Sequence, residues 1–243
     1  MMTVLLTLLL PSPGHAEGVA ETVSEAFPPP VGAVRRPADP WGAHLQALPL
    51  RSAETPVHTY DGRVVAHDAR VVDLPLVAGD LQQCADSILR LRAEWLRDQG
   101  RSVSFHATSG DPMPWSRYQG GERAAAVGRG LQWSGGRGPA TWDQYLRALF
   151  TWAGTLSLEA HDTQPTTDLA AGTVLVRGGS PGHAVLVLDV ADGPDGTWLL
   201  VGEGYMPAQD FHVERGPNGG WWPWVPGLNL SHWTFGAADL QRF

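Results

Sequence analysis

Three short β-branched runs in the last third of the chain constrain the fold most. They cover Gly172–Arg177, His183–Asp189 and Thr197–Glu203, and Gly-rich stretches separate them. Between the second and third runs, residues 191–196 read Ala-Asp-Gly-Pro-Asp-Gly, which predicts a hairpin turn. Strands joined by short turns pair antiparallel, so we expect an antiparallel sheet in this part of the chain.

Two amphipathic segments come before these strands. Apolar residues lie three or four positions apart from Leu81 to Trp95, which is one face of a helix. Asp80 is the expected N-cap, and Gln83 completes a capping box. A second helix is predicted after Thr141, whereas the Gly-rich stretch before it, residues 110–139, predicts a long irregular loop. Helices followed by an antiparallel sheet indicate an α+β fold.

The N-terminal residues have the pattern of an export signal. An apolar run, Met1–Leu10, precedes the small-x-small site Gly14-His15-Ala16, which predicts a signal peptide over residues 1–16. This run is shorter than the roughly 20 residues of a membrane-spanning helix, so no stable membrane insertion is expected after cleavage. Residues 17–50 are Pro-rich and predict a linker, followed by one domain over 51–243. We therefore expect a periplasmic or extracellular protein.

Composition narrows the classes of partner and cofactor. The chain is 43% hydrophobic and 17% charged, as in globular proteins. A net charge of −8, with no cationic cluster beyond Arg35 and Arg36, argues against a nucleic-acid partner. The histidines lack metal-ligand spacing such as His-x-x-x-His, so neither a metal nor another cofactor is expected.

The most reactive residue types fall at positions that suggest nucleophilic catalysis. Cys84, the only cysteine, lies in the first turn of the predicted helix, where unpaired N–H groups stabilise a thiolate. Hairpin pairing would bring His183 and Glu203 within about 5 Å as a base and its orienting group. The amides of Gln82 or Gln83 would then stabilise the oxyanion. The alternative interpretation of Cys84 is a small buried apolar side chain.

These residues resemble two groups of proteins. A cysteine opening a helix, then Gly-His at the head of a strand and a polar residue on the next strand, is similar to the papain-like NlpC-type and CHAP-type cell-wall hydrolases. That resemblance implies an N-terminal helix carrying Cys84 packed on an antiparallel β-sheet. In NlpC-type enzymes, however, the cysteine directly follows an Asp, whereas Cys84 comes four residues after Asp80.

A second resemblance rests on longer motifs and covers roughly Leu48 to Phe243. The chain resembles the bacterial family called domain of unknown function 4846. This resemblance implies an exported protein of uncharacterised activity. The motifs are Asp80-Leu-Gln-Gln-Cys-Ala-Asp86, Arg90-Leu-Arg-Ala-Glu94, Phe150-Thr-Trp-Ala-Gly-Thr-Leu-Ser-Leu158, Gly178-Gly-Ser-Pro-Gly-His-Ala184 and Tyr205-Met-Pro-Ala-Gln209.

Eleven tryptophans suggest either a densely packed core or an aromatic binding surface. The candidate groove residues are Trp115, Trp221, Trp222, Tyr205 and Gln209.

The sequence is compatible with two functions. The first is a cysteine hydrolase of amide bonds in cell-wall peptides, with peptidoglycan or another envelope peptide as its partner. The alternative is a non-catalytic exported module that binds a glycan or peptide through the aromatic groove.

Overall fold

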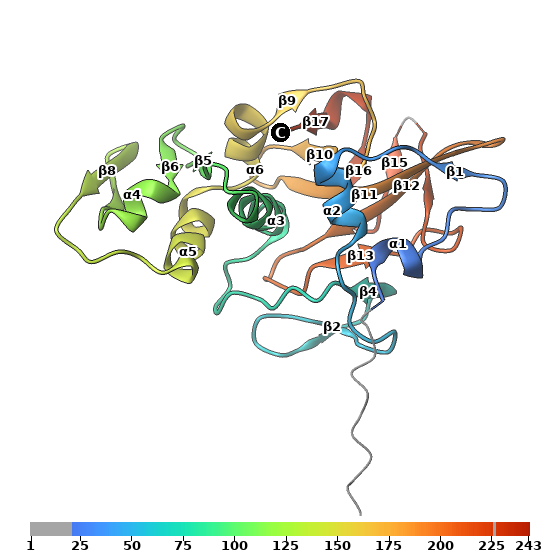
Figure 1. Cartoon of the computed structure of the whole chain (residues 1–243), viewed down its shortest axis with the longest axis horizontal. Coiled ribbons are helices and arrows are strands. Elements are labelled where there is room, and N and C mark those ends of the chain that lie inside the picture. The colour runs from blue at the N-terminus through green and yellow to red at the C-terminus, as the bar shows by residue number, and fades with distance from the viewer. Residues whose placement is uncertain (1–20, 226) are drawn as a thin grey trace, which may run out of the picture.

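The computed structural model describes residues 21–225 and 227–243. Its sheet lies to one side of helix α3 (Cys84–Asp98), and a lobe of short helices and hairpins lies to the other side (Figure 1). Within the described residues, nine strands form one antiparallel sheet, ordered β4-β13-β12-β11-β10-β17-β9, with β1 on β11 and β14 on β12. The strands are β4 (Ala69–Val71), β13 (His212–Glu214), β12 (Gly196–Glu203), β11 (His183–Gly193), β10 (Val174–Arg177), β17 (Leu240–Arg242), β9 (Gln164–Pro165), β1 (Val34–Arg35) and β14 (Trp222–Pro223).

The three strands predicted from the β-branched runs are β10, β11 and β12, at the centre of this sheet. β11 continues to Gly193 and β12 begins at Gly196, so the hairpin turn is tighter than the six-residue segment suggested. Helices pack against this antiparallel sheet, and the fold is therefore α+β.

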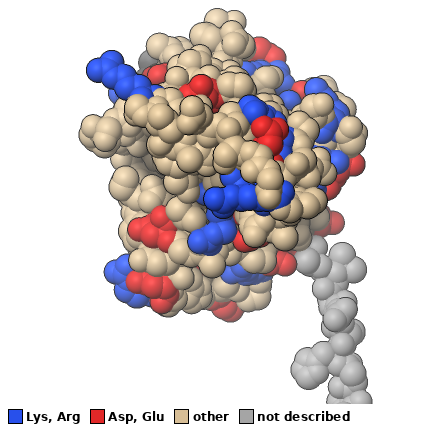
Figure 2. Space-filling model, turned by 90° about the vertical axis from the view of Figure 1, so that its left-hand side faces the viewer, with Lys and Arg blue, Asp and Glu red and all other residues tan. Residues whose placement is uncertain are grey.

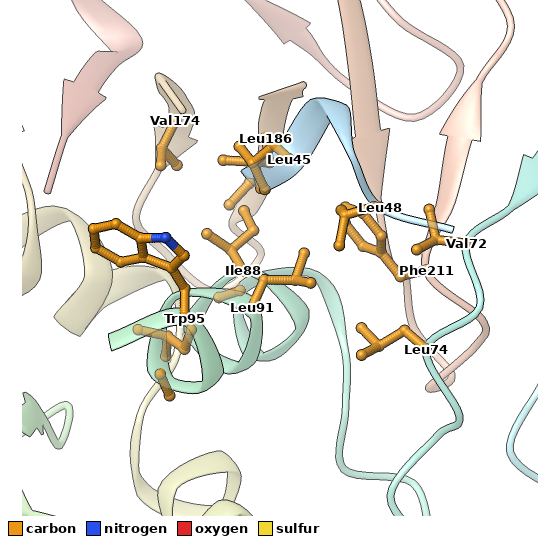
Figure 3. Close-up of a cluster of buried hydrophobic side chains, with 14 of the residues drawn as sticks. Leu45, Leu48, Val72, Leu74, Ile88, Leu91, Trp95, Val174, Leu186 and Phe211 are labelled. Carbon is orange, nitrogen blue, oxygen red and sulfur yellow. The ribbon is translucent and has the colours of Figure 1, made fainter. Parts of the chain in front are cut away.

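Helix α3 covers one face of the sheet and supplies much of the larger core. Its Ile88, Leu91 and Trp95 lie beside Leu186 of β11 and Leu45 of α2 (Pro40–Gln46) (Figure 3). On the other face, a smaller core forms under the hairpin of β15 (Leu228–Asn229) and β16 (Thr234–Phe235). The sheet is thus buried on both faces, and its strands carry apolar residues at successive positions.

Residues 21–50 are not a linker, and that prediction is wrong for the part of the segment that the structure describes. They form α1 (Val23–Ala26), β1 and α2, and Phe27, Trp41 and Leu45 are at most 4% exposed. The prolines are compatible with this packing because Pro40 takes the first position of α2, where a missing N–H costs nothing. The signal peptide predicted over residues 1–16 lies outside the described residues.

The segment predicted as a long loop, residues 110–139, is mostly regular. It contains β6 (Pro112–Pro114), which pairs with β5 (Ser104–His106), then α4 (Trp115–Gln119) and the hairpin of β7 (Arg123–Val127) and β8 (Gly130–Ser134). Helix α5 (Trp142–Trp152) follows, as predicted. The remaining elements are β2 (Val57–His58), β3 (Val64–Val65), α6 (Thr155–Ser157), a π-helix (Leu158–Asp162) and a 3-10 helix (Ala237–Asp239).

On the side of the molecule that carries the lobe, basic and acidic side chains are scattered over a larger uncharged surface (Figure 2). Among the residues described, no helix is both long and apolar enough to cross a membrane.

Candidate functional site

Cys84 is the first residue of α3, in the first turn as predicted. The N-cap is Gln83 rather than Asp80, and Asp86 closes the capping box by accepting the Gln83 N–H at 3.0 Å. Asp80 instead accepts the Ala208 N–H at 2.7 Å. The observed helix therefore begins three residues later than predicted, and Cys84 lies directly at its N-terminus.

An open pocket of about 270 Å³ lies at this helix N-terminus. Cys84, Gln83 and Asp86 form one wall, and Thr155 with the turn at residues 179–182 forms another. Burial, together with the charges of Asp86 and Glu203, raises the pKa of the Cys84 thiol to about 11, although backbone N–H groups of residues 85 and 184 hydrogen-bond the sulfur. The thiol is therefore protonated at neutral pH.

His183 and Glu203 form the pair that the hairpin suggested. Nε2 of His183 lies 2.8 Å from Oε2 of Glu203, and both side chains are at most 2% exposed. Leu186 pairs with Gly202, and this register places Glu203 beside Val185, two positions along the strand from His183. A two-residue offset keeps both side chains on one face of the sheet, so they meet diagonally.

The side chains of this pair and Cys84 approach β11 differently, since the Cys84 sulfur contacts the backbone N–H of residue 184. Ala184 belongs to the core under α3, and a Cβ on Gly204 would lie 2.7 Å from Ser87 of α3. Because neighbouring side chains on a strand point to opposite faces, His183 and Glu203 point away from α3. Among the described residues, no hydrogen bond joins the Cys84 sulfur to the His183 ring. The structure therefore pairs His183 with Glu203 and directs both side chains to the face of the sheet opposite α3.

The two predicted oxyanion donors have different surroundings. Gln82 is fully buried, and its Oε1 accepts hydrogen bonds from Arg90 at 2.6 Å and from the Val77 N–H at 3.3 Å. Gln82 does not line the pocket. Gln83 does line it, with Nε2 donating to Asp80 at 3.3 Å.

The aromatic residues predicted to line a groove are dispersed. Trp221 is fully buried, Trp115 packs on the core of the lobe, and Gln209 is 3% exposed. Trp222 is partly buried and packs on the smaller core. These four side chains form no shared open groove, whereas Tyr205 lies beside His183 with ring centroids 5.3 Å apart.

Three further histidines gather around Glu203. Nδ1 of His232 lies 2.9 Å from Oε1 of Glu203, and Nε2 of His212 lies 3.6 Å from the same oxygen. His67 stacks on His232 at a centroid distance of 5.6 Å. We call the four histidines and Glu203 the histidine cluster. The sequence analysis did not identify His67, His212 and His232 as members, because they come from separate segments without motif spacing.

Electrostatics within the histidine cluster favours an ionised carboxylate. Burial disfavours the charge on Glu203, but the hydrogen bonds from His183 and His232 and the nearby His212 ring outweigh burial and hold its pKa well below the usual range. The hydrogen bond to Glu203 in turn raises the pKa of His232. His232 is 25% exposed and stacks on Tyr205 at 3.9 Å between centroids, so the cluster reaches the protein surface.

Comparison with known proteins gives one match. The family described as domain of unknown function (4846) matches residues 23–242, which confirms the resemblance read from the longer motifs. No curated protein and no solved structure is significantly similar to the chain.

Proposed function

This chain belongs to the family described as domain of unknown function 4846, and on that premise we propose that it hydrolyses amide bonds in cell-envelope peptides at the histidine cluster. One observation carries the proposal: a buried, ionised Glu203 is hydrogen-bonded to His183 and to the solvent-reaching His232. An imidazole held by a carboxylate is the arrangement of a general base and its orienting group.

His232 is the member of the cluster that can meet a substrate. Because an ionised carboxylate only accepts hydrogen bonds, the His232 nitrogen facing Glu203, Nδ1, carries a proton. In the neutral ring, Nε2 then has the free electron pair. It would take a proton from the attacking water and later give it to the leaving amine, while the charge on Glu203 stabilises the imidazolium.

His183 has a positioning role in this scheme. It is 2% exposed and donates to the second oxygen of Glu203 at 2.8 Å, which fixes the plane of the carboxylate. The export pattern over residues 1–16 supports a substrate in the cell envelope.

A second candidate is the cysteine hydrolase. Cys84 at the N-terminus of α3, on the wall of an open pocket, favours it. The raised pKa of Cys84 and the orientation of His183 away from α3 both count against it.

The test compares C84S, H232N and a control, H161Q, which changes an exposed histidine elsewhere. Release of new amino groups from peptidoglycan fragments is measured, with circular dichroism as the check on folding. Loss of a general base lowers kcat/KM by roughly 10²–10⁴-fold, which is the expectation for H232N. C84S and H161Q should retain wild-type activity.

Two other results would reject the proposal. An inactive C84S beside an active H232N would transfer the active site to Cys84. A wild-type protein that binds the fragments without cleaving them would favour the non-catalytic binding module.

A further inference from the structure

Three members of the histidine cluster converge from neighbouring strands. His67 precedes β4, His212 begins β13 and Glu203 ends β12, and β13 pairs with both of the other strands. One ligand atom from each side chain lies within 4.8 Å of the other two. A carboxylate and two imidazoles from separate segments therefore point at one small volume.

The imidazole nitrogens in this volume have no protein partner. Nε2 of His67 and Nε2 of His212 are both buried without a hydrogen bond. Buried polar atoms are nearly always satisfied, so two such atoms side by side require an explanation.

The protonation of His212 sharpens the problem. Its Nδ1 lies 2.9 Å from the backbone carbonyl oxygen of Asp210, which can only accept, so Nδ1 carries a proton. In the neutral ring Nε2 then presents a lone pair to Oε1 of Glu203, 3.6 Å away. Two such acceptors facing each other in a buried place repel, and either a second proton on His212 or a cation bound between the two atoms removes this repulsion.

We propose that His67, Glu203 and His212 bind a divalent transition-metal ion of the zinc type. Two histidines and one glutamate are the protein ligands of many catalytic zinc sites, in which the fourth position stays open for water. Bonds of about 2.0–2.1 Å place ligand atoms roughly 3.3 Å apart around such an ion. The 3.6 Å between His212 and Glu203 is already close to that spacing.

The surroundings resemble the outer shell of a metal site. Metal-bound histidines usually donate their second N–H to a carbonyl, as His212 does to Asp210, and ligating carboxylates are themselves hydrogen-bonded, as Glu203 is by His183. A bound ion would supply the acidified water that an amide hydrolase needs. Only this catalytic role rests on the proposed function; metal binding stands on the geometry.

Zinc binding by calorimetry tests the inference on protein purified without a histidine tag and stripped with a chelator. The diagnostic variant is H67Q, because His67 is partly exposed and its Nε2 makes no hydrogen bond that the substitution would break. H161Q is the control. Wild type and H161Q should bind one zinc ion per chain, and H67Q should bind at least about 10-fold more weakly.

A wild-type protein without saturable zinc binding, or an H67Q variant with unchanged affinity, would overturn the inference. Substitution with Co²⁺ gives a second readout, since ligation by His67 predicts visible absorption bands that H67Q loses. Calorimetry needs no substrate, so the two proposals fail separately. Hydrolysis without zinc binding contradicts the metal site alone, and zinc binding without hydrolysis contradicts the proposed activity alone.

Discussion

At the scale of single residues, Cys84 shows that a helix N-terminus does not by itself make a reactive thiol. The N–H groups of residues 85 and 184 favour the thiolate, but burial and the charges of Asp86 and Glu203 favour the thiol more, and the pKa rises to about 11. In the folded protein the sulfur therefore holds its proton throughout the physiological range.

This pKa predicts slow alkylation of Cys84. Only the thiolate reacts, and a rise in the thiol pKa from the ordinary 9.0 to about 11 reduces the thiolate fraction roughly 100-fold at pH 7.5. Iodoacetamide should thus modify Cys84 more slowly in the native chain than in the same chain in urea, as followed by intact-mass spectrometry. A native rate equal to or above the unfolded rate would show an activated thiol and revive the cysteine hydrolase.

At the scale of elements, the N-terminus of α3 contains a carboxyl group with an unusual environment. Asp86 is 6% exposed, its Oδ1 has no partner, and its Oδ2 caps the helix through the Gln83 N–H. Burial raises the pKa of Asp86 to about 8, although two backbone N–H groups oppose the shift. The folded protein therefore binds a proton at pH values where the unfolded chain has released it.

The sign of the pH dependence follows from that difference. The stabilisation is complete below the ordinary Asp pKa of 3.8 and is lost as the pH rises toward about 8. Between pH 5 and 7.5, the unfolding free energy of wild type relative to D86N should fall by up to about 1.4 kcal/mol per pH unit. Urea denaturation at several pH values measures this difference in unfolding free energy, with D98N, at an exposed position, as the control. Parallel pH profiles of wild type and D86N would contradict the raised pKa of Asp86.

Elements with a local signature could be predicted from the sequence. The apolar spacing gave α3, and the Gly-rich turn gave the β11–β12 hairpin together with the meeting of His183 and Glu203. The side of the sheet on which α3 packs could not be predicted. β11 is buried on both faces and its residues 184–188 are all apolar, so this run carries no alternation that distinguishes the faces.

The rest of the histidine cluster depends on distant pairing. His67 and His212 meet because β4 joins the edge of the sheet beside β13, and His232 arrives on the hairpin of β15 and β16. No fixed spacing in the sequence encodes these contacts. Metal-ligand motifs reveal sites built within one segment, whereas the histidine cluster is assembled from five segments by the strand order.

At the scale of the whole molecule, the N-terminal segment completes the fold. Asp189 of β11 is fully buried, and its carboxylate accepts hydrogen bonds from Arg35 of β1 at 2.5 Å and from Gln46 of α2 at 2.7 Å. Without residues 21–50 this carboxylate would lose its only cationic partner among the described residues and keep the Val190 N–H alone, which is strongly destabilising. Residues 21–50 therefore belong to the domain, in agreement with a family match over residues 23–242.

Two substitutions in this segment test whether it is part of the domain. Leu45 is fully buried among α2, α3 and the sheet, so L45A leaves a cavity and should lower the unfolding free energy by about 2–5 kcal/mol. Val31 lies in the same segment and is fully exposed, so V31A should change it by less than about 0.5 kcal/mol. Urea unfolding followed by tryptophan fluorescence gives both values. A linker would tolerate both changes equally, so matching midpoints for the two variants would place the domain boundary after residue 50. A large effect of L45A alone would show that the N-terminal segment is part of the core.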